Sequence, residues 1–599
     1  MDNGGKAAPA GGALRQRRWP LAALWGLLVL VGAGLAATSA GAQSEAPLAA
    51  VAGRLRDLIA QRDSAEGFHC RGELVCGIRW IPDFYAARDH VPVWLDDRGL
   101  GPAAYVLMRE LRQAEADGLH PGDYHLDAVS GLLAALQRDQ GTSLEAAPAA
   151  WADIDLLLTD AFLLLGAHLA RGRVNPETLH ADWVLSETAI DLLEMLQEGV
   201  SANRIHRFLD DIRPLHAGYR GLRVALQAMR DLALEGGWPL IPVGPTMRSG
   251  DQDARVLVLR HRLIIGGDLP AEAWPEAPEI FDEDLRAAVV RFQKRHGLVS
   301  DGLVGGNTLR ALNVTVQERV RRIELNLERW RWLPNDLGDR YIVVNTADFN
   351  LRVVQDGQVT MRQRVVVGRP HRQTPVFSAP LTHVVFNPQW NVPHTIAVED
   401  MLPRIQQDVT YLETQGIRIY RGWDADSPAI DPWEIDWHAY HAKRFPFRLV
   451  QAPGPMNALG RIQFMMPNKF AVFLHDTPGR GLFARSKRDF SSGCIRVEDA
   501  AALAHYLLME NPRWTYDAIQ SILDAGQRRV VPLAFRIPVH LLYMTAWVEE
   551  DGTLQFRDDI YERDRVLDRA LRQRLPMEGG QDHQLRTGPV SRWTKSERG

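Results

Sequence analysis

The chain is poor in the residues on which several enzyme classes depend. Its 599 residues include three cysteines and six lysines. The nineteen histidines form no His-Glu-x-x-His pair and the cysteines form no Cys-x-x-Cys pair, so the sequence disfavours a zinc hydrolase. None of the six lysines follows a serine by three residues, which excludes the Ser-x-x-Lys motif of serine D,D-transpeptidases.

Overall composition is that of an ordinary globular protein. Hydrophobic residues make up 46% and charged residues 24% of the chain, and the net charge is -5. No basic stripe with interleaved aromatic residues is present, so we expect no nucleic-acid partner. The length is sufficient for roughly three or four domains, each with its own core.

The N-terminus has the order of parts of a secretory signal. Arg15, Arg17 and Arg18 precede an apolar run over residues 21–37, and the small-x-small sequence at residues 40–42 follows. This pattern predicts a signal peptide over residues 1–42 and export of the rest of the chain. The alternative is an uncleaved anchor that would hold the protein at the inner membrane, since the apolar run is near the lower length limit for a span.

Cysteine usage agrees with export. Cys70 and Cys76 are separated by five residues, and Cys494 stands alone far along the chain. In an oxidising compartment the first two are predicted to form a disulfide, which leaves one free thiol. The alternative is that they stay reduced, because sequence spacing does not establish the required geometry.

The most informative stretch contains that third cysteine. His475 ends an alternating apolar run that predicts a strand over residues 471–475, and Cys494 follows the tight turn at residues 491–493. A helical pattern over residues 497–508 comes next. A thiol is a nucleophile only as thiolate, so a nearby imidazole and the start of that helix would both favour reactivity. Amides around Gly493 and Cys494 could form an oxyanion hole.

At these positions the chain resembles the L,D-transpeptidase (YkuD) catalytic domain, in particular its YcbB-like periplasmic branch. The resemblance maps the family signature onto His475, Ser491, Gly493, Cys494 and Arg496. Ser492 stands where this family frequently has histidine. Residues 374–377 and 386–393 are also similar to that branch. The resemblance implies Cys494 as nucleophile, His475 as general base and acid, Gly493 as part of the oxyanion turn, and a substrate-binding set of Arg496, Ser491, Ser492, Trp390 and Asn391.

The periodicity predicts a multidomain α+β fold. Helical spacing dominates residues 45–245, predicted as a helical scaffold domain, and three short helices over residues 250–315 resemble the small peptidoglycan-binding module. A helical connector follows at residues 316–338. Alternating runs then predict a β-rich catalytic domain over residues 339–560, with a late hairpin of residues 539–548 and 553–557, and a polar tail over residues 561–599. The module could also be a degenerate spacer.

An insertion over residues 396–449 interrupts the β-rich pattern. It is rich in aromatic and histidine side chains, namely Tyr411, Tyr420, Trp423, Trp433, Trp437, His438, Tyr440 and His441. Such an irregular segment beside a catalytic motif suits a capping loop over an elongated ligand, which the resemblance also implies. The alternative is a surface subdomain that covers its own small core.

The resemblance implies a periplasmic peptidoglycan L,D-transpeptidase. It would form 3-3 cross-links between stem peptides through a cysteine thioester with release of D-alanine, and a carbapenem would acylate the same thiol. We expect stem peptides and glycan strands as partners and no metal or organic cofactor. The alternatives are a cysteine L,D-carboxypeptidase or endopeptidase on the same bonds, and a non-catalytic cell-wall-binding scaffold. The sequence identifies no cell-wall synthase partner.

Overall fold

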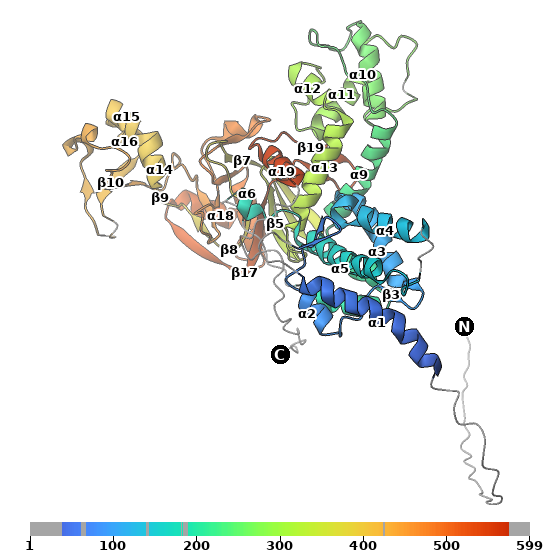
Figure 1. The fold of residues 1–599 in the computed structure, drawn as a ribbon. Coiled ribbons are helices and arrows are strands. Elements are labelled where there is room, and N and C mark those ends of the chain that lie inside the picture. The colour runs from blue at the N-terminus through green and yellow to red at the C-terminus, as the bar shows by residue number, and fades with distance from the viewer. Residues whose placement is uncertain are drawn as a thin grey trace, which may run out of the picture.

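A computed structural model of the chain describes residues 39–61, 68–138, 143–180, 183, 190–272, 274–422, 424 and 426–573. The apolar run over residues 21–37 and Trp423 therefore lie outside the described residues, whereas residues 40–42 fall in helix α1 (Ser39–Ala60). Within the described part of the chain, no helix is both long and apolar enough to cross a membrane. The predicted multidomain α+β fold is confirmed, with a helical N-terminal region, a helical module and a β-rich C-terminal region (Figure 1).

The N-terminal region is a helical layer packed around the buried helix α5 (Pro148–Arg171). Almost every position of α5 from Trp151 to Leu165 is buried, so it forms the centre rather than one face of the region. Around it lie α1, α2 (Ile81–Ala86), α3 (Pro102–Gln113), η1 (Ala114–Asp117), η2 (Pro121–Tyr124), α4 (Leu126–Arg138), α6 (Pro176–Leu179), α7 (Leu192–Ser201) and α8 (Ile205–Asp211), with the strand pairs β1 (His69–Cys70) with β2 (Glu73–Leu74) and β3 (Leu95–Asp96) with β4 (Gly99–Leu100). Helix α9 (Ala217–Leu234) follows and shares a smaller core with Ile323 and Leu327.

The predicted disulfide between Cys70 and Cys76 is wrong, because all three cysteines are free thiols. Cys70 lies in β1 with its Sγ 3.6 Å from the Asp153 Oδ1 atom of α5. The backbone N–H of Cys76 donates instead to Asp160, which lies seven residues after Asp153 in α5. The two residues are thus held by different carboxylates, and burial raises the pKa of the Cys76 thiol to about 12.

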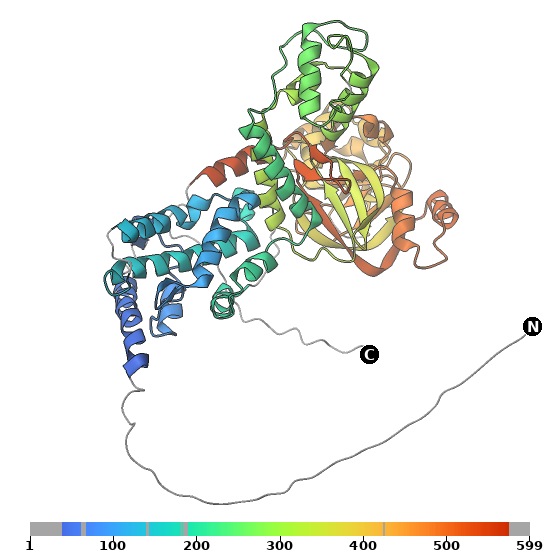
Figure 2. The ribbon, with the colours of Figure 1, turned by 90° about the vertical axis from the view of Figure 1, so that its right-hand side faces the viewer.

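The three-helix module stands above the rest of the molecule and joins it through one long helix (Figures 1 and 2). Its helices α10 (Ala254–Ile265), α11 (Glu283–Arg295) and α12 (Gly306–Leu312) enclose a core of their own. Gly305 is the N-cap residue of α12. The connector forms helix α13 (Val316–Arg331), opened by a Thr315/Glu318 capping box.

The β-rich region is built on one nine-stranded sheet. Its strand order is β15-β7-β16-β14-β13-β8-β17-β5-β6, and an added pairing of β6 with β7 closes it on itself. The strands are β5 (Arg340–Asn345), β6 (Asn350–Gln355), β7 (Gln358–Gly368), β8 (Phe377–Phe386), β13 (Ile462–Met465), β14 (Leu474–His475), β15 (Asp489–Ser491), β16 (Ile495–Val497) and β17 (Arg529–Leu542). Helices α17 (Ala500–Leu508) and α18 (Tyr516–Ala525) add to the same apolar core.

Two expectations about this region are corrected. The strand ending at His475 begins at Leu474, because Ala471 has a positive φ of 52° and interrupts the extended backbone. The late hairpin pairs β18 (Ala546–Val548) with β19 (Leu554–Phe556), whereas the apolar run over residues 539–542 belongs to β17 of the main sheet. After the hairpin, α19 (Arg563–Arg572) packs with Arg563 and Leu567 buried.

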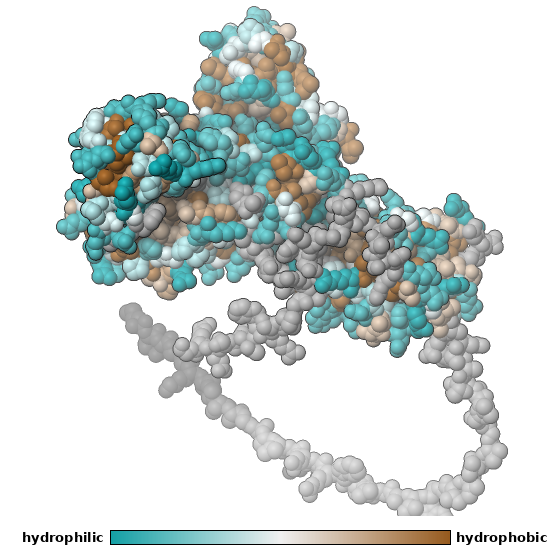
Figure 3. Space-filling model, turned by 60° about the vertical axis from the view of Figure 1, so that its left-hand side comes forward, coloured by the Kyte–Doolittle hydropathy of each residue, from teal (hydrophilic) through white to brown (hydrophobic). Residues whose placement is uncertain are grey.

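The insertion is a folded subdomain that projects from the end of the sheet opposite the N-terminal region (Figure 1). It contains β9 (Trp390–Asn391), α14 (His394–Ile396), the π-helix η3 (Ala397–Met401), α15 (Leu402–Gln407), α16 (Thr410–Thr414), β10 (Ile417–Arg421), β11 (Ala429–Ile430), η4 (Pro432–Glu434), η5 (Trp437–Ala439) and β12 (Phe447–Gln451). Four of these strands form a separate sheet over a separate apolar core. On the face drawn in Figure 3, apolar residues are scattered among hydrophilic ones.

Candidate active site

Neighbouring parallel strands bring the predicted histidine and cysteine to one place. In the pairing of β14 with β16, His475 lies opposite Arg496, and Cys494 is two positions before Arg496. Since side chains alternate between the faces of a strand, His475, Cys494 and Arg496 share one face. Leu474 and Ile495, which point the other way, are fully buried in the core of the sheet.

The turn before Cys494 is held by short-range hydrogen bonds. The Ser491 hydroxyl donates to the Cys494 carbonyl at 2.6 Å and accepts from the Gly493 N–H at 3.2 Å. Gly493 has φ of +116°, a conformation that a residue with a side chain rarely adopts. In this state the Gly493 amide is therefore engaged inside the turn.

A threonine outside the motif fixes the same turn. The Thr374 hydroxyl donates to the Gly493 carbonyl at 2.8 Å and accepts from the Gly368 N–H at 2.9 Å. Gly368 ends β7, and an added Cβ there would lie 2.2 Å from the Arg372 carbonyl oxygen. The Tyr561 hydroxyl donates to the Gly368 carbonyl at 2.5 Å. Only the similarity of residues 374–377 to the YcbB-like branch pointed to Thr374 in the sequence.

His475 is oriented by the main chain. Its Nδ1 atom lies 2.5 Å from the Asp476 carbonyl oxygen, and a carbonyl can only accept a hydrogen bond. The proton therefore sits on Nδ1, and Nε2 is left as the basic atom. Burial and the positive charge of Arg496 lower the pKa of His475 to about 4, although the carbonyls of Asp476 and Leu459 oppose this shift.

The thiol is also neutral in this state. Burial raises the pKa of Cys494, while a backbone hydrogen bond from Phe473 and the positive charge of Arg496 lower it. The sequence predicted a helix start close to Cys494. Helix α17 begins only at Ala500, after strand β16, so Cys494 does not lie at a helix N-terminus. Arg496 itself has its Nε atom buried without a hydrogen-bond partner among the described residues, and burial lowers its pKa.

Two arginines that the sequence did not single out reach Ser492. Arg369 donates from Nη2 at 3.0 Å and Arg372 from Nη1 at 3.1 Å to the Ser492 hydroxyl oxygen. Both lie in the connection between β7 and β8. The Ser492 side chain is thus committed to protein contacts.

The remaining predicted substrate-binding residues lie at the base of the insertion. Trp390 and Asn391 form β9, which pairs with Gln451 and Val450 of β12. Trp390 also packs against the apolar core of the insertion. The structure therefore places this pair where the insertion leaves the main sheet.

A polar cavity of about 690 Å³ lies behind the histidine. Its walls come from β7, β13, α17 and α18, and include Asp476 and Arg480. These two side chains form an ion pair at 2.7 Å. Among the described residues, no group of three or more His, Cys, Asp or Glu side chains is arranged to hold a metal ion.

Three family models match the chain, each over a separate stretch. Residues 79–226 match "Scaffold domain", residues 252–312 match "Putative peptidoglycan binding domain", and residues 339–521 match "L,D-transpeptidase catalytic domain". A Haemophilus influenzae protein named "Putative L,D-transpeptidase" is 38% identical over 250 residues, which are 42% of this chain and 49% of the relative. The chain thus spans about half the length of that relative.

Solved structures give only a weak likeness. An L,D-transpeptidase from Mycobacterium smegmatis is 14% identical over 34% of this chain and 58% of its own, with a TM-score of 0.17. An L,D-transpeptidase from Xylanimonas cellulosilytica is 14% identical over 50% of this chain and 98% of its own, with a TM-score of 0.14. We draw nothing from these superpositions, and the similarity to L,D-transpeptidases rests on the sequence matches.

Proposed function

We propose, from the premise that the chain carries a YkuD-type L,D-transpeptidase catalytic domain beside a peptidoglycan-binding domain, that it forms 3-3 cross-links between peptidoglycan stem peptides. The observation that carries the proposal is the His475/Cys494/Arg496 face, which lies within the matched catalytic domain. The proposal includes export to the periplasm, where peptidoglycan is the substrate.

In the first half-reaction, Cys494 attacks the carbonyl between the third and fourth residues of a tetrapeptide stem. Its proton passes to Nε2 of His475, because Nδ1 already donates to the Asp476 carbonyl. The imidazolium then protonates the leaving amine, so D-alanine departs and the stem is held as a thioester. No metal or organic cofactor takes part in the proposed steps.

Arg496 supports the charges that this step creates. A fixed cation beside the thiol favours thiolate over thiol. Together with the Cys494 amide, it also stabilises the negative charge on the oxygen of the tetrahedral intermediate. The same charge disfavours an imidazolium at rest, which keeps His475 ready to accept a proton. The Arg496 guanidinium, whose Nε has no hydrogen-bond partner in the described part of the chain, can also bind a carboxylate of the stem peptide.

The second half-reaction distinguishes the enzyme classes. An amine of a neighbouring stem that attacks the thioester gives a 3-3 cross-link, whereas water gives a tripeptide and makes the enzyme a carboxypeptidase. Both reactions use the same Cys494 and His475 chemistry. The insertion supports the first outcome, since a folded subdomain beside the site can position a second stem and exclude water.

The test is to incubate purified protein with tetrapeptide muropeptides and weigh the products. A dimer of mass equal to two substrates minus one D-alanine is the expected result. A tripeptide monomer as the only product would make the chain a carboxypeptidase. Unchanged substrate would contradict catalysis and favour a wall-binding scaffold.

A further inference from the structure

One guanidinium joins the insertion to the catalytic turn. Arg372 lies 2.5 Å from Asp400 through Nη1 and also contacts Glu399 through Nη2. The same Nη1 atom donates to the Ser492 hydroxyl at 3.1 Å, and Ser492 is two residues before Cys494. The Arg372 side chain is only 13% exposed, whereas those of Asp400 and Glu399 are 32% and 54% exposed, so the bridge is partly open to water on its acidic side.

Arg369 makes this link rigid on the side of the turn. Its backbone N–H donates to the Ser491 carbonyl at 3.0 Å, and its Nη2 atom donates to the Ser492 hydroxyl at 3.0 Å. The Arg372 N–H donates in turn to the Arg369 carbonyl at 2.9 Å. Because both arginines hydrogen-bond the same hydroxyl, the turn and the segment from 369 to 372 must move together.

On the side of the insertion, both acids lie in the π-helix η3. Such a helix is uncommon and occurs frequently at functional sites. The apolar core of the insertion is separate from that of the main sheet. An apolar interface therefore does not set the distance between η3 and Cys494. Ion pairs do, chiefly those of Arg372, with a longer one between Arg369 and Asp400 at 3.6 Å.

We propose that Arg372 is a positioning residue that couples the insertion to the Cys494 turn. This inference rests on the proposed function and adds how the second substrate is aligned. With the bridge formed by Arg372, Asp400, Glu399 and Ser492 in place, the insertion holds a long substrate in register with the thioester. Without the bridge, Cys494 keeps its own environment, which depends on Phe473 and Arg496.

The test compares Arg372→Gln with wild type in two reactions. Cross-linking of tetrapeptide muropeptides is expected to fall about ten- to a hundredfold in kcat/KM, because the second stem is no longer aligned. Alkylation of Cys494 by a small electrophile is expected to stay within about twofold, since the groups that set the thiol pKa are untouched. Arg404→Gln is the matched control, because Arg404 belongs to the insertion and lies over the Tyr411 ring.

A charge exchange separates coupling from simple damage. Asp400→Asn should reproduce the loss, and the double variant Arg372→Asp with Asp400→Arg should recover part of the cross-linking rate. Equal loss of cross-linking and alkylation in Arg372→Gln would show a structural role in the turn. No loss in either reaction would overturn the proposal.

Hydrogen exchange keeps the inference testable if the wild-type protein forms no cross-links. Arg372→Gln should speed amide exchange in residues 394–407 of the folded protein by about tenfold, while Arg404→Gln should not. Unchanged exchange would overturn the bridge itself. Faster exchange in a protein without cross-linking activity would instead refute the proposed function and leave the bridge standing.

Discussion

The catalytic sheet has two junctions of opposite character, one toward helix α13 and one toward the insertion. On the α13 side, Arg329 forms a buried ion pair with Asp564 at 2.6 Å, and Asn326 hydrogen-bonds Thr545 at 2.9 Å. On the insertion side, the bridge of Arg372 includes Glu399, whose side chain is 54% exposed. The α13 junction is shielded from water, whereas the insertion junction is partly exposed to it.

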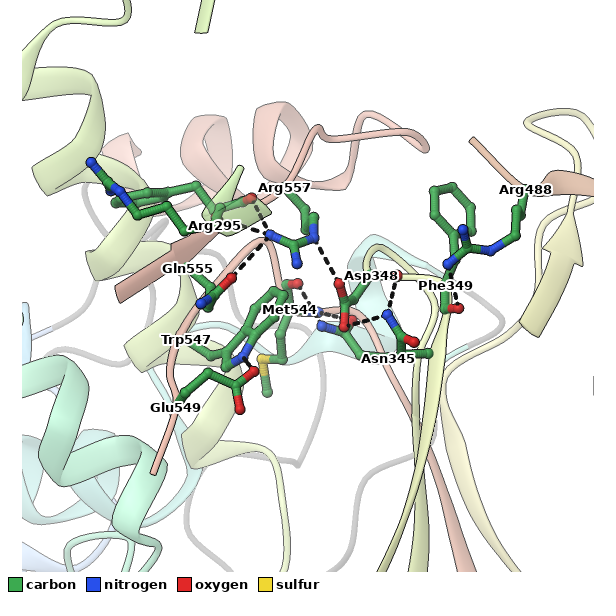
Figure 4. Close-up of polar contacts among 12 residues, drawn as sticks. Arg295, Asn345, Asp348, Phe349, Arg488, Met544, Trp547, Glu549, Gln555 and Arg557 are labelled. Atoms are coloured by element: carbon green, nitrogen blue, oxygen red, sulfur yellow. Dashed lines mark hydrogen bonds and ion pairs between the residues drawn. The ribbon is translucent and has the colours of Figure 1, made fainter. Parts of the chain in front are cut away.

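The α13 side extends to the peptidoglycan-binding domain through Arg557. Figure 4 shows this guanidinium between the Arg295 carbonyl of α11 and the Asp348 carboxylate that follows β5. Next to Asp348, the Phe349 carbonyl accepts from Arg488 at 3.0 Å, just before the strand that leads to the catalytic turn. The domain is thus joined to the catalytic region through this guanidinium and through the stacking of His296 on Phe556.

This difference in burial indicates which of the two junctions can change its geometry. Breaking a buried, hydrogen-bonded ion pair leaves an uncompensated charge in the interior, so the α13 junction resists separation. Ion pairs that are partly exposed contribute less and are weakened by salt, so the insertion can change its position at lower cost. We expect the peptidoglycan-binding domain to act as a fixed anchor and the insertion as the adjustable part.

The largest expected effect is a loss of stability at the buried α13 junction. Asp564→Ala should lower the free energy of unfolding by about 3–5 kcal/mol, because Arg329 would be left buried without its carboxylate. Urea unfolding followed by circular dichroism measures the change. Glu562→Ala removes the exposed partner of Arg565 on the same segment and should cost no more than about 1 kcal/mol. Similar losses of unfolding free energy in both variants would contradict the difference that we infer between buried and exposed ion pairs.

Removal of the insertion tests the adjustable side. The Val392 N–H donates to the Leu449 carbonyl at 2.9 Å, so a short linker can join these two residues and keep β9 together with the last three residues of β12. Cross-linking should fall about a hundredfold or more, while alkylation of Cys494 should stay within about threefold, because the thiol environment lies outside the insertion. An equal loss of both would instead make the insertion a structural support for the sheet.

The pH dependence of alkylation gives a smaller effect that sharpens the same point. Because the pKa of Cys494 is raised and that of His475 is lowered, the pair is neutral near pH 7. The alkylation rate should therefore rise about tenfold per pH unit from pH 6 to 8, as the thiolate fraction grows. The full chain and the variant without the insertion should share this slope. A rate already constant from pH 5 would indicate a thiolate and imidazolium pair at rest.

Much of the fold was predictable from the sequence because local periodicity decides it. The connector predicted over residues 316–338 forms helix α13 from the predicted first residue but ends at Arg331, and the strands β5, β6 and β7 follow from alternating apolar residues. The split of residues 539–548 between two sheets was not predictable, because an unbroken apolar run does not show which sheet each half joins. The Cys70 and Cys76 pairing failed for a similar reason, since long-range contacts with α5 orient both residues.

The candidate site was predictable only in part. His475 and Cys494 stand out because they occupy motif positions, and the structure places His475 in β14 and Cys494 directly before the adjacent strand β16. Thr374, Arg369 and Arg372 reach the turn from a connection more than a hundred residues earlier in the chain. Their role depends on the pairing of β7 with β15 and β16, which a sequence pattern does not encode.

The measurement that tests the central claim most directly is the intact mass of the protein after exposure to a carbapenem. The account predicts one covalent adduct on the wild-type protein, and none on Cys494→Ala that remains folded by circular dichroism. His475→Ala should still form the adduct, about 10²- to 10⁴-fold more slowly, with partial recovery at high pH as hydroxide supplies thiolate. An adduct that persists on folded Cys494→Ala would place the nucleophile elsewhere and contradict the account.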